Sequence, residues 1–364
     1  MADNPEGKDF YLKTAVDVAV DLRSWLAEWV LVDLVKAEDI TAASNDLLAF
    51  AKDFGAAEAA AEGEKEIEAI ASSATKKLCD LNKEGKANTV WGHDYASGLT
   101  HSLRRGARWV TSNPCKIQLF KKDFPDYYQE LIAEIKRENA GATPAVMAAQ
   151  MFTKVCAISA RALYPIFKAT NKQYGFVCVQ VDPRDIKDAD AMIKQVEFWY
   201  DAMKKELGVE EPNVVFKLPA VEAALEAARI LLEKNYKLCM TMNITVPQHL
   251  RFAEILSKGK KNGYLVLMGD QLDDQIAKEL EAKGVENAKD IAKHGAEAVI
   301  RKSYRLLAEK GYKNLSIMTA AVCGPWHIQN SFAPVGGAPV LITTVTGKIN
   351  QFDTIAENIM SDVI

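Results

Sequence analysis

A lysine inside an apolar run is the residue whose type and position best suit covalent chemistry. Lys217 lies in VVFKLPA at residues 214–220, where a strand would point Phe216 and Leu218 to the opposite side. If those two residues pack under helices, Lys217 points into the interior of the sheet. Burial disfavours the charged ammonium, and a neutral amine can attack a carbonyl to form a Schiff base. Two alternatives stay open: the lysine extends to solvent, or it pairs with an interior carboxylate.

Polar residues also stand at comparable points of other apolar runs. Taken singly, each is more often a structural hydrogen-bonding group or a cap than a catalyst, and Asn113-Pro114 is a good strand-ending turn by itself. Together they form a series of polar groups at strand ends, which is what a site inside a barrel requires. These candidates are His93, Asp94, Asn113, Gln180, Thr241, Asn243, Asp270 and Thr319.

The elements that must position these residues are eight β-rich runs separated by helical patterns. Runs that are apolar on both faces and alternate with helices indicate a parallel sheet covered by helices. Eight such units favour an α/β fold of the (β/α)8 barrel type, the TIM barrel, over an open sheet. No GxGxxG or GxxxxGK[ST] motif follows the first run, which weakens a nucleotide-binding alternative. The runs are 89–95, 108–114, 174–183, 213–220, 237–244, 264–271, 314–322 and 339–345.

Residues 1–85 have a different composition from the rest of the chain. They are rich in Ala, Glu, Lys and Leu and contain no strand pattern, so we expect a helical N-terminal extension before a barrel domain over 86–364. The apolar stretch 16–35 carries five charges, which fits an amphipathic helix and not a membrane span. We expect its apolar face to pack on the barrel or to mediate self-association; a regulatory partner site is the alternative. That face comprises Trp25, Leu26, Trp29, Val30 and Leu34.

The overall composition excludes several other classes of protein. Of the 364 residues, 49% are hydrophobic and 26% are charged, as in soluble globular enzymes. Lys and Arg total 45 against 49 Asp and Glu, and a net charge of −4 gives no electrostatic case for a nucleic-acid partner. The six cysteines lack CxxC or metal-ligand spacing, as in reduced intracellular proteins. The acidic N-terminus has no signal-peptide pattern, so we expect a cytoplasmic protein without a membrane partner.

Three segments resemble the transaldolase family of Schiff-base aldolases. VTSNP at 110–114 resembles the second-strand motif of that family, and QVDPR at 180–184 resembles its third-strand motif. NVVFKLPA at 213–220, with the helix and strand that follow, resembles its lysine strand. The resemblance covers residues 89–364 and leaves the N-terminal region outside.

The resemblance implies a role for each matching residue. Lys217 would form the imine with a ketose donor, and Asn113 would bind the donor hydroxyls. Thr241 would lie near the imine and a catalytic water. Asp94 is the candidate for the acid/base that handles the proton of C–C cleavage, with His93 as the alternative. Such chemistry needs no metal and no organic cofactor.

The departures from the family bear on the substrate. Gln180 stands where transaldolases have a glutamate, and in this respect the chain is similar to fructose-6-phosphate aldolases, which release the donor fragment. Asp270 stands where the family has an arginine, and residues 319–324 lack the family's Ser and Arg that bind phosphate. Because a phosphate needs a cation or several aimed N–H donors, and Asp270 would repel it, the sequence predicts a weakened phosphate anchor.

Three further segments carry residues that could bind a ligand or lie at the surface. GPWHIQNSF at 324–332 places His327 after the seventh run, where it could bind a neutral sugar or shuttle protons; a packed loop is the alternative. GGAP at 336–339 could form a backbone nest for an anion. KGKK at 258–261 is expected to be solvated surface at the opposite rim.

The sequence therefore predicts a transaldolase-like enzyme that cleaves or transfers a dihydroxyacetone-type ketose unit. Lys217, Asp94, Gln180 and Thr241 are the predicted catalytic residues. A small sugar or sugar phosphate is the expected partner, and the N-terminal helices could form a homo-oligomer. Two alternatives stay open: a divergent aldolase acting on unphosphorylated substrates, and a non-catalytic barrel that binds a partner. The predicted substrate-binding residues are Asn113, Asn243, Asp270, Thr319 and His327.

Overall fold

The structure of the chain is a computed structural model. It describes residues 5–32, 35–95, 98–322, 324 and 340–344. His327 and the 336–339 segment, both considered for the site above, lie outside these ranges.

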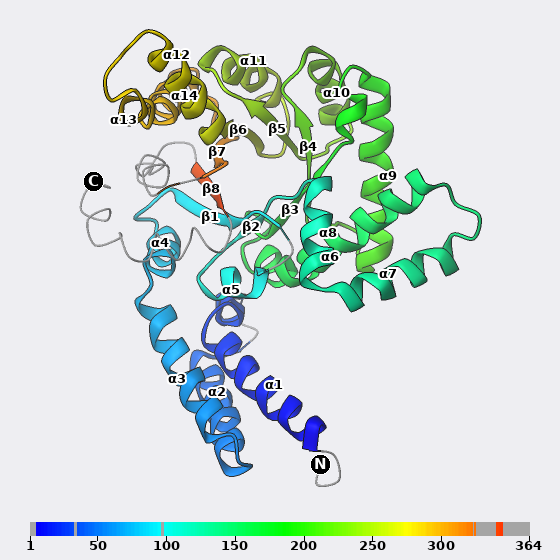
Figure 1. Cartoon of the computed structure of the whole chain (residues 1–364), viewed down its shortest axis with the longest axis vertical. Helices are drawn as coiled ribbons and strands as arrows, with labels where there is room; N and C mark the ends of the chain where they lie inside the picture. The colour runs from blue at the N-terminus through cyan, green and yellow to red at the C-terminus, as the bar shows by residue number, and fades with distance from the viewer. Residues whose placement is uncertain (1–4, 33–34, 96–97, 323, 325–339, 345–364) are drawn as a thin grey trace.

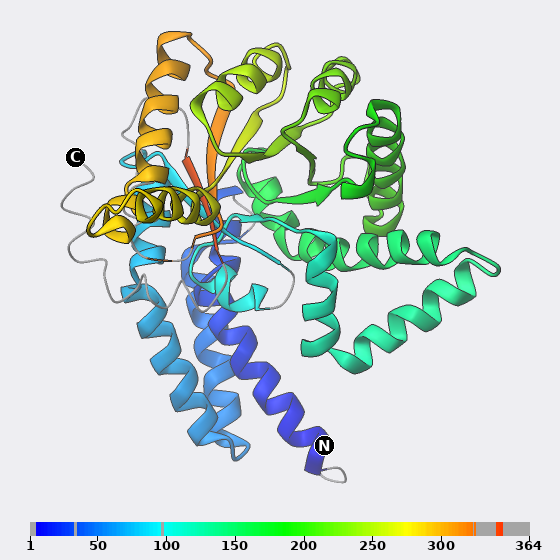
Figure 2. The same cartoon turned by 45° about the horizontal axis from the view of Figure 1, so that its top comes forward.

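The centre of the protein is a curled parallel sheet with helices on its outer side (Figures 1 and 2). Each strand pairs with the next along the chain, and β8 pairs with both β7 and β1, so the ring of strands closes. All eight predicted runs contain a strand, which confirms the expected α/β class. Any helix after β8 lies outside the described residues. The strands are β1 (Thr89–His93), β2 (Trp109–Val110), β3 (Phe176–Gln180), β4 (Val214–Pro219), β5 (Leu238–Asn243), β6 (Gly263–Met268), β7 (Leu315–Ala320) and β8 (Val340–Thr344).

Large aromatic side chains fill the amino end of the ring. The Trp109 ring centroid lies 4.5 Å from that of Tyr264 and 5.3 Å from that of Phe176. Gly92 on the neighbouring strand allows the backbone of Trp109 to approach closely, because a Cβ at Gly92 would lie 2.6 Å from the Trp109 carbonyl oxygen. The aromatic cluster therefore fills the interior at the amino ends of the strands. Space for polar side chains remains at the carboxyl ends.

Helices follow most strands and pack on the outer face of the sheet. The helices α8 and α11 were not expected from the sequence, although α8 is long and contributes buried residues to the core. It also extended the sixth run to residue 271, which is wrong, because the chain turns directly into α12 at Gly269. These helices are α5 (Leu99–Arg104), α6 (Ile117–Asp123), α7 (Pro125–Glu138), α8 (Pro144–Ala169), α9 (Ala189–Leu207), α10 (Glu222–Glu233), α11 (Val246–Leu256), α12 (Gly269–Ala282), α13 (Ala288–Ala292) and α14 (Gly295–Glu309).

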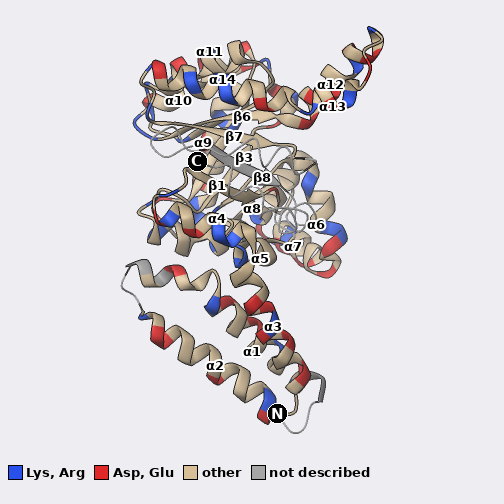
Figure 3. Ribbon diagram, turned by 90° about the vertical axis from the view of Figure 1, so that its left-hand side faces the viewer, with Lys and Arg blue, Asp and Glu red and all other residues tan. Residues whose placement is uncertain are grey.

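The N-terminal residues form helices, as expected, that extend away from the strands (Figures 1 and 3). Within the amphipathic stretch 16–35, α1 ends at Arg23 and a 3-10 helix, η1, follows. The Ser24 hydroxyl donates to the Val20 carbonyl at 2.7 Å, and the chain then turns so that Glu28 reaches the barrel. The elements are α1 (Pro5–Arg23), η1 (Leu26–Val32), α2 (Ala37–Asp53), α3 (Ala57–Ser72) and α4 (Ala74–Lys83).

Two buried arginines attach these helices to the rest of the protein. Arg104 on α5 binds Asp21 at 2.7 Å and Glu66 at 3.0 Å. Arg108, just before β2, donates to both carboxylate oxygens of Glu28 at 2.9 Å. Because both arginines are paired while buried, they hold the extension in one position. No described helix is long and apolar enough to cross a membrane.

Candidate active site

Lys217 lies on β4 with its side chain on the inner face of the sheet. Its neighbours in register are Gln180 on β3 and Cys239 on β5. Phe216, which precedes it, packs on the outer side, where its ring centroid lies 6.4 Å from that of Tyr200 on α9. Since side chains alternate along a strand, Lys217 points inward. It is only 9% exposed, as the sequence predicted for a lysine inside an apolar run.

The amino group of Lys217 lies among thiols. Burial opposes ionisation of the Cys178 thiol, but its hydrogen bond with Cys239 and the positive charge of Lys217 outweigh burial, so the pKa of Cys178 lies below its usual value. Burial and the same hydrogen bond raise the pKa of Cys239. The Trp109 indole N–H completes this layer by donating to the Cys178 sulfur at 3.2 Å.

Asp94, whose charge acts on the Cys178 thiol of this layer, is paired with a lysine other than Lys217. Within the described ranges no carboxylate lies within ion-pair distance of Lys217, and Asp94 pairs with Lys116 instead. The predicted alternative in which Lys217 is neutralised by an interior carboxylate is therefore not found in this part of the chain. An amine without a carboxylate partner is suited to attack a carbonyl.

Asp94 directly follows β1 and faces the carboxyl end of the strands. The Thr111 hydroxyl donates to its Oδ1 at 2.6 Å, and Lys116 Nζ lies 3.3 Å from its Oδ2. Its negative charge acts on the Cys178 thiol, as the positive charge of Lys217 does, so both groups lie above the same interior layer. His93 is fully buried, and its Nδ1 lies 2.9 Å from the Ser102 hydroxyl on α5. Asp94 thus lies at the carboxyl end of the strands, whereas His93 is directed toward α5.

Lys116 is a site residue that the sequence analysis missed. It ends the short 3-10 helix η2 (Pro114–Lys116), and Asn113 caps this turn by accepting from the Lys116 N–H at 3.2 Å. Asn113 thus uses its side-chain oxygen for the cap, while the Lys116 ammonium reaches Asp94. The available signal was a lysine within three residues of the Asn-Pro turn, which brings a cation to the end of β2.

The end of β5 brings one predicted residue to the site and turns another away. Thr241 lies opposite Pro219 on β4, is 5% exposed, and has the same strand parity as Cys239. A positive φ of 66° at Met242 then interrupts the strand. Asn243 comes to lie opposite Leu267, fully buried, with its amide donating to the Met240 carbonyl at 2.7 Å. It stabilises the irregular backbone and does not face Lys217.

The ends of β6 and β7 contribute less than the sequence indicated. Asp270 lies in the first turn of α12, where a carboxylate is stabilised by the helix dipole, and its N–H donates to the Ala321 carbonyl at 3.2 Å. Thr319 is fully buried and pairs with Leu267 on β6. The residue before it, Met318, pairs with Val266, whose side chain faces inward. Thr319 therefore faces the helices. His327 lies outside the described residues.

A parallel α/β sheet with polar side chains at the carboxyl ends of its strands is the arrangement found in enzymes of the TIM-barrel-like class. A family model described as Transaldolase/Fructose-6-phosphate aldolase matches residues 99–353, and the chain belongs to this family. The resemblance noted in the sequence is thereby confirmed.

Curated relatives named transaldolase match parts of the chain at low identity. The Neisseria gonorrhoeae transaldolase is 25% identical over 168 residues, which cover 44% of this chain and 43% of that protein. The Mycobacterium ulcerans transaldolase is 29% identical over 143 residues, covering 38% of this chain and 35% of that protein. An Arthrobacter transaldolase is 26% identical over 240 residues, covering 61% of this chain and 62% of that protein. The chain thus spans less than two thirds of the length of each of these relatives.

Proposed function

We propose that the chain is a transaldolase-like aldolase that forms a Schiff base with a ketose on Lys217. The observation that carries this proposal is the placement of Lys217: buried on the inner face of β4 and without a carboxylate partner in the described part of the chain. Gln180 and Thr241 lie on the two adjacent strands. Family membership supports the same chemistry.

The reaction begins at the ketose carbonyl. Lys217 Nζ attacks the carbonyl carbon to give a carbinolamine, which loses water to form the imine. Asp94 takes the proton from the hydroxyl at C4, the C3–C4 bond breaks, and the imine nitrogen accepts the electron pair. The first aldehyde leaves. The remaining enamine then adds to a second aldehyde, or it is protonated and the imine is hydrolysed.

Gln180 governs how water takes part in these steps. Its amide can hold a water molecule beside Lys217, but it cannot exchange a proton as a carboxyl group does. Hydrolytic release of the donor fragment, as in the fructose-6-phosphate aldolases that share this residue, is the outcome we propose over transfer.

A second candidate is an aldolase that acts on unphosphorylated substrates. The observation that favours it is the pair of β6 and β7 ends, where the described residues present Asp270 and Ala321 and no Lys or Arg. Lys116 is the cation that the fold brings nearest to Asp94, and it is already paired. A phosphate at the site would have to compete with Asp94 for this lysine.

Borohydride trapping tests both candidates and the non-catalytic alternative. The protein is incubated with fructose 6-phosphate, fructose or dihydroxyacetone, reduced, and analysed by intact mass and peptide mapping. We expect an adduct on Lys217 that is absent in Lys217→Met and present in Lys302→Met, an exposed lysine on α14. Adducts from neutral donors alone support the second candidate. No adduct with any donor, on protein that is folded by circular dichroism, contradicts the aldolase proposal and supports a binding role.

The proposal extends to the organisation of the chain. We propose that residues 86–364 form a complete (β/α)8 barrel domain that acts in the cytoplasm on small sugar substrates without a metal or organic cofactor. Residues 1–85 form a separate extension that mediates self-association. Exposed Phe10, Tyr11 and Phe54 on α1 and after α2 support this role, because large exposed apolar groups mark interaction surfaces. A dimer in mass photometry that is lost in Phe10→Ser/Phe54→Ser is the expected result, and an unchanged monomer contradicts it.

A further inference from the structure

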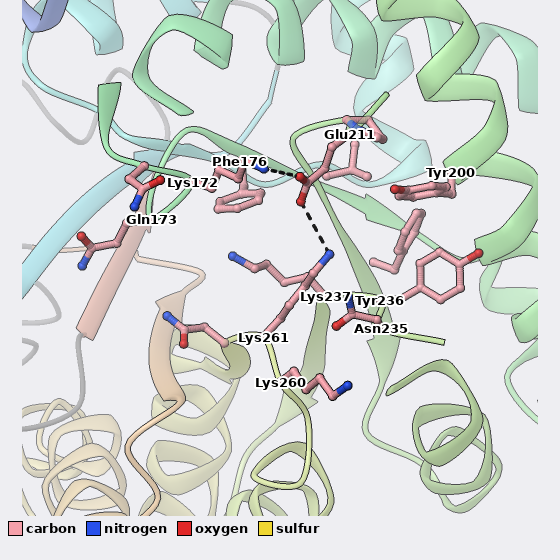
Figure 4. A pocket seen from close by; sticks show the side chains of 15 residues that line it. Lys172, Gln173, Phe176, Tyr200, Glu211, Asn235, Tyr236, Lys237, Lys260 and Lys261 are labelled. Atoms are coloured by element: carbon pink, nitrogen blue, oxygen red, sulfur yellow. Dashed lines mark hydrogen bonds and ion pairs between the residues drawn. The ribbon is translucent and has the colours of Figure 1, made fainter. Parts of the chain in front are cut away.

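A pocket of about 420 Å³ opens at the amino end of the sheet, opposite to the end that carries Asp94 (Figure 4). Its lining includes the first residues of two strands, Phe176 of β3 and Val214 of β4. Lys237 and Asn262, which immediately precede β5 and β6, complete this edge. The volume lies in the range of small-molecule sites, about 300–1,000 Å³.

The pocket is rich in cations. Four lysines line it and one carboxylate, Glu211, accompanies them: Lys172, Lys237, Lys260 and Lys261. Glu211 pairs with Lys172 at 2.5 Å and with Lys261 at 3.7 Å, as the dashed lines in Figure 4 mark. Among the described residues no carboxylate forms an ion pair with Lys237 or Lys260. The amines of these two lysines are therefore available to an anion that enters the pocket.

Lys237 occupies the floor of the pocket. Its Nζ lies 3.6 Å from the centroid of the Phe176 ring and 5.9 Å from that of Tyr264. Burial, together with the nearby charge of Lys261, lowers the pKa of Lys237 to about 7. Placing a charged amine on this floor is costly, and an anion in the pocket would offset that cost.

Neutral hydrogen-bonding groups surround the lysines. Four amide side chains line the pocket, and the phenols of Tyr200 and Tyr236 lie on the right-hand side of Figure 4. Asn171 and Asn235 adopt positive φ values of 48° and 63°, so tight turns hold these two residues at the rim. Amides donate and accept hydrogen bonds, which suits hydroxyl groups of a ligand. The amides are Asn171, Gln173, Asn235 and Asn262.

We propose that this pocket is a second binding site, separate from Lys217, for a small phosphorylated polyhydroxy compound of sugar-phosphate size. Lys237 and Lys260 bind the phosphate, and the amides bind hydroxyl groups. The sequence analysis assigned residues 258–261 to solvated surface, but the fold brings Lys260 and Lys261 to a shared cavity with Lys237. The competing explanation is that Lys237 only packs against the aromatic rings and has no ligand. In that case no phosphate compound binds in the pocket.

Calorimetry with glycerol 3-phosphate as the probe tests the site directly. Binding is measured at pH 8 in two buffers of different ionisation enthalpy, which gives the number of protons taken up. We expect uptake approaching one proton per phosphate bound, because Lys237 is mostly neutral before binding and becomes charged beside the anion. Glycerol, which lacks the phosphate, should not bind measurably.

Variants locate the binding and separate it from the active site. Lys260→Glu reverses an exposed charge at the rim and should weaken binding at least tenfold, whereas Lys302→Glu, a matched change on α14, should not. Lys237→Met should abolish the proton uptake, and Lys217→Met should leave both affinity and uptake unchanged. If Lys237→Met does not fold, the Lys260→Glu comparison alone decides the proposal.

Three outcomes would overturn the proposal. The first is the absence of binding at 10 mM probe, which corresponds to a binding free energy of about −3 kcal/mol. The second is the same affinity in Lys260→Glu and Lys302→Glu. The third is binding that disappears in Lys217→Met. The last outcome would assign the phosphate to the active site. Because the probe has no carbonyl, none of these results depends on Schiff-base formation.

Discussion

Two lysines with different surroundings lie toward opposite ends of the ring of strands. Lys217 on β4 lies beside thiols, an amide and a hydroxyl, whereas Lys237, just before β5, lies against aromatic rings and opens onto a pocket. Neither has a carboxylate partner in the described part of the chain. The difference lies in what each amine can meet: a carbonyl at the carboxyl end, where strand-end loops assemble a site, and an anion at the amino end.

The amino end also carries the attachment of the N-terminal helices. Arg108, which binds Glu28, immediately precedes β2, and its guanidinium lies 5.3 Å from the centroid of the Tyr174 ring. The amino end therefore holds the N-terminal helices, and our two proposals assign covalent chemistry to the carboxyl end and anion binding to the amino end.

The largest expected effect is the loss of turnover when the nucleophile at the carboxyl end is removed. Lys217→Met should lower kcat/KM for the preferred ketose at least about 10³-fold, because a covalent nucleophile has no substitute. Steady-state assays of aldehyde release measure it, with Lys302→Met as the control. Activity within tenfold of the unmodified protein would show that Lys217 is not the nucleophile.

The proton-transfer role of Asp94 is the next largest effect. Asp94→Asn should lower kcat about 10²–10⁴-fold while the borohydride adduct on Lys217 still forms, because imine formation precedes C–C cleavage. The readouts are rapid-quench turnover and adduct mass. Loss of the adduct together with turnover would instead indicate that Asp94 only holds the site in shape through Thr111 and Lys116.

A change at the amino end should affect stability and spare the chemistry. Glu28→Gln leaves Arg108 charged and buried with a neutral partner, and should reduce the free energy of unfolding by about 3 kcal/mol. The borohydride adduct should persist below the melting temperature. Glu64→Gln removes an exposed pair with Lys52 at 2.7 Å and should cost less than about 1 kcal/mol. Equal effects of the two changes in urea titrations would contradict the anchoring role of Glu28.

The smallest predicted effect is a pH dependence of stability. It comes from a buried histidine that lies at neither end of the ring of strands. His249 on α11 is buried against Ser303, with its Nδ1 2.8 Å from the hydroxyl, and burial lowers its pKa to about 4. Between pH 6.5 and 4 the unfolded chain binds the extra proton, so this contribution to stability is present above pH 6.5 and falls as the pH decreases.

Urea titrations at pH 7.5 and 5.5 measure the effect of His249. The unmodified protein should lose about 1 kcal/mol more than His249→Gln between these two values. His294→Gln, which replaces an exposed histidine beside Glu297, serves as the control and should behave like the unmodified protein. The same pH dependence in all three proteins would remove His249 as the cause.

Local patterns were sufficient for the strands and for the inward direction of Lys217. Alternation along a strand has a period of two residues, so Phe216 and Leu218 determine the side on which Lys217 lies. The same reasoning failed for Asn243, because the positive φ at Met242 shifts the register and moves its side chain to the helix side. It failed for Thr319 because the pairing of β7 with β6 sets the face.

The sequence by itself determined the order of the strands, the family and the inward direction of Lys217, because apolar periodicity and short motifs are properties of neighbouring residues. Only the tertiary structure decided which distant groups meet. Lys116 reaches Asp94 across two strand ends, and Lys237 shares a cavity with Lys172 and Lys260 from other loops. Such meetings depend on strand register and ring closure, which bring together residues that no local pattern connects.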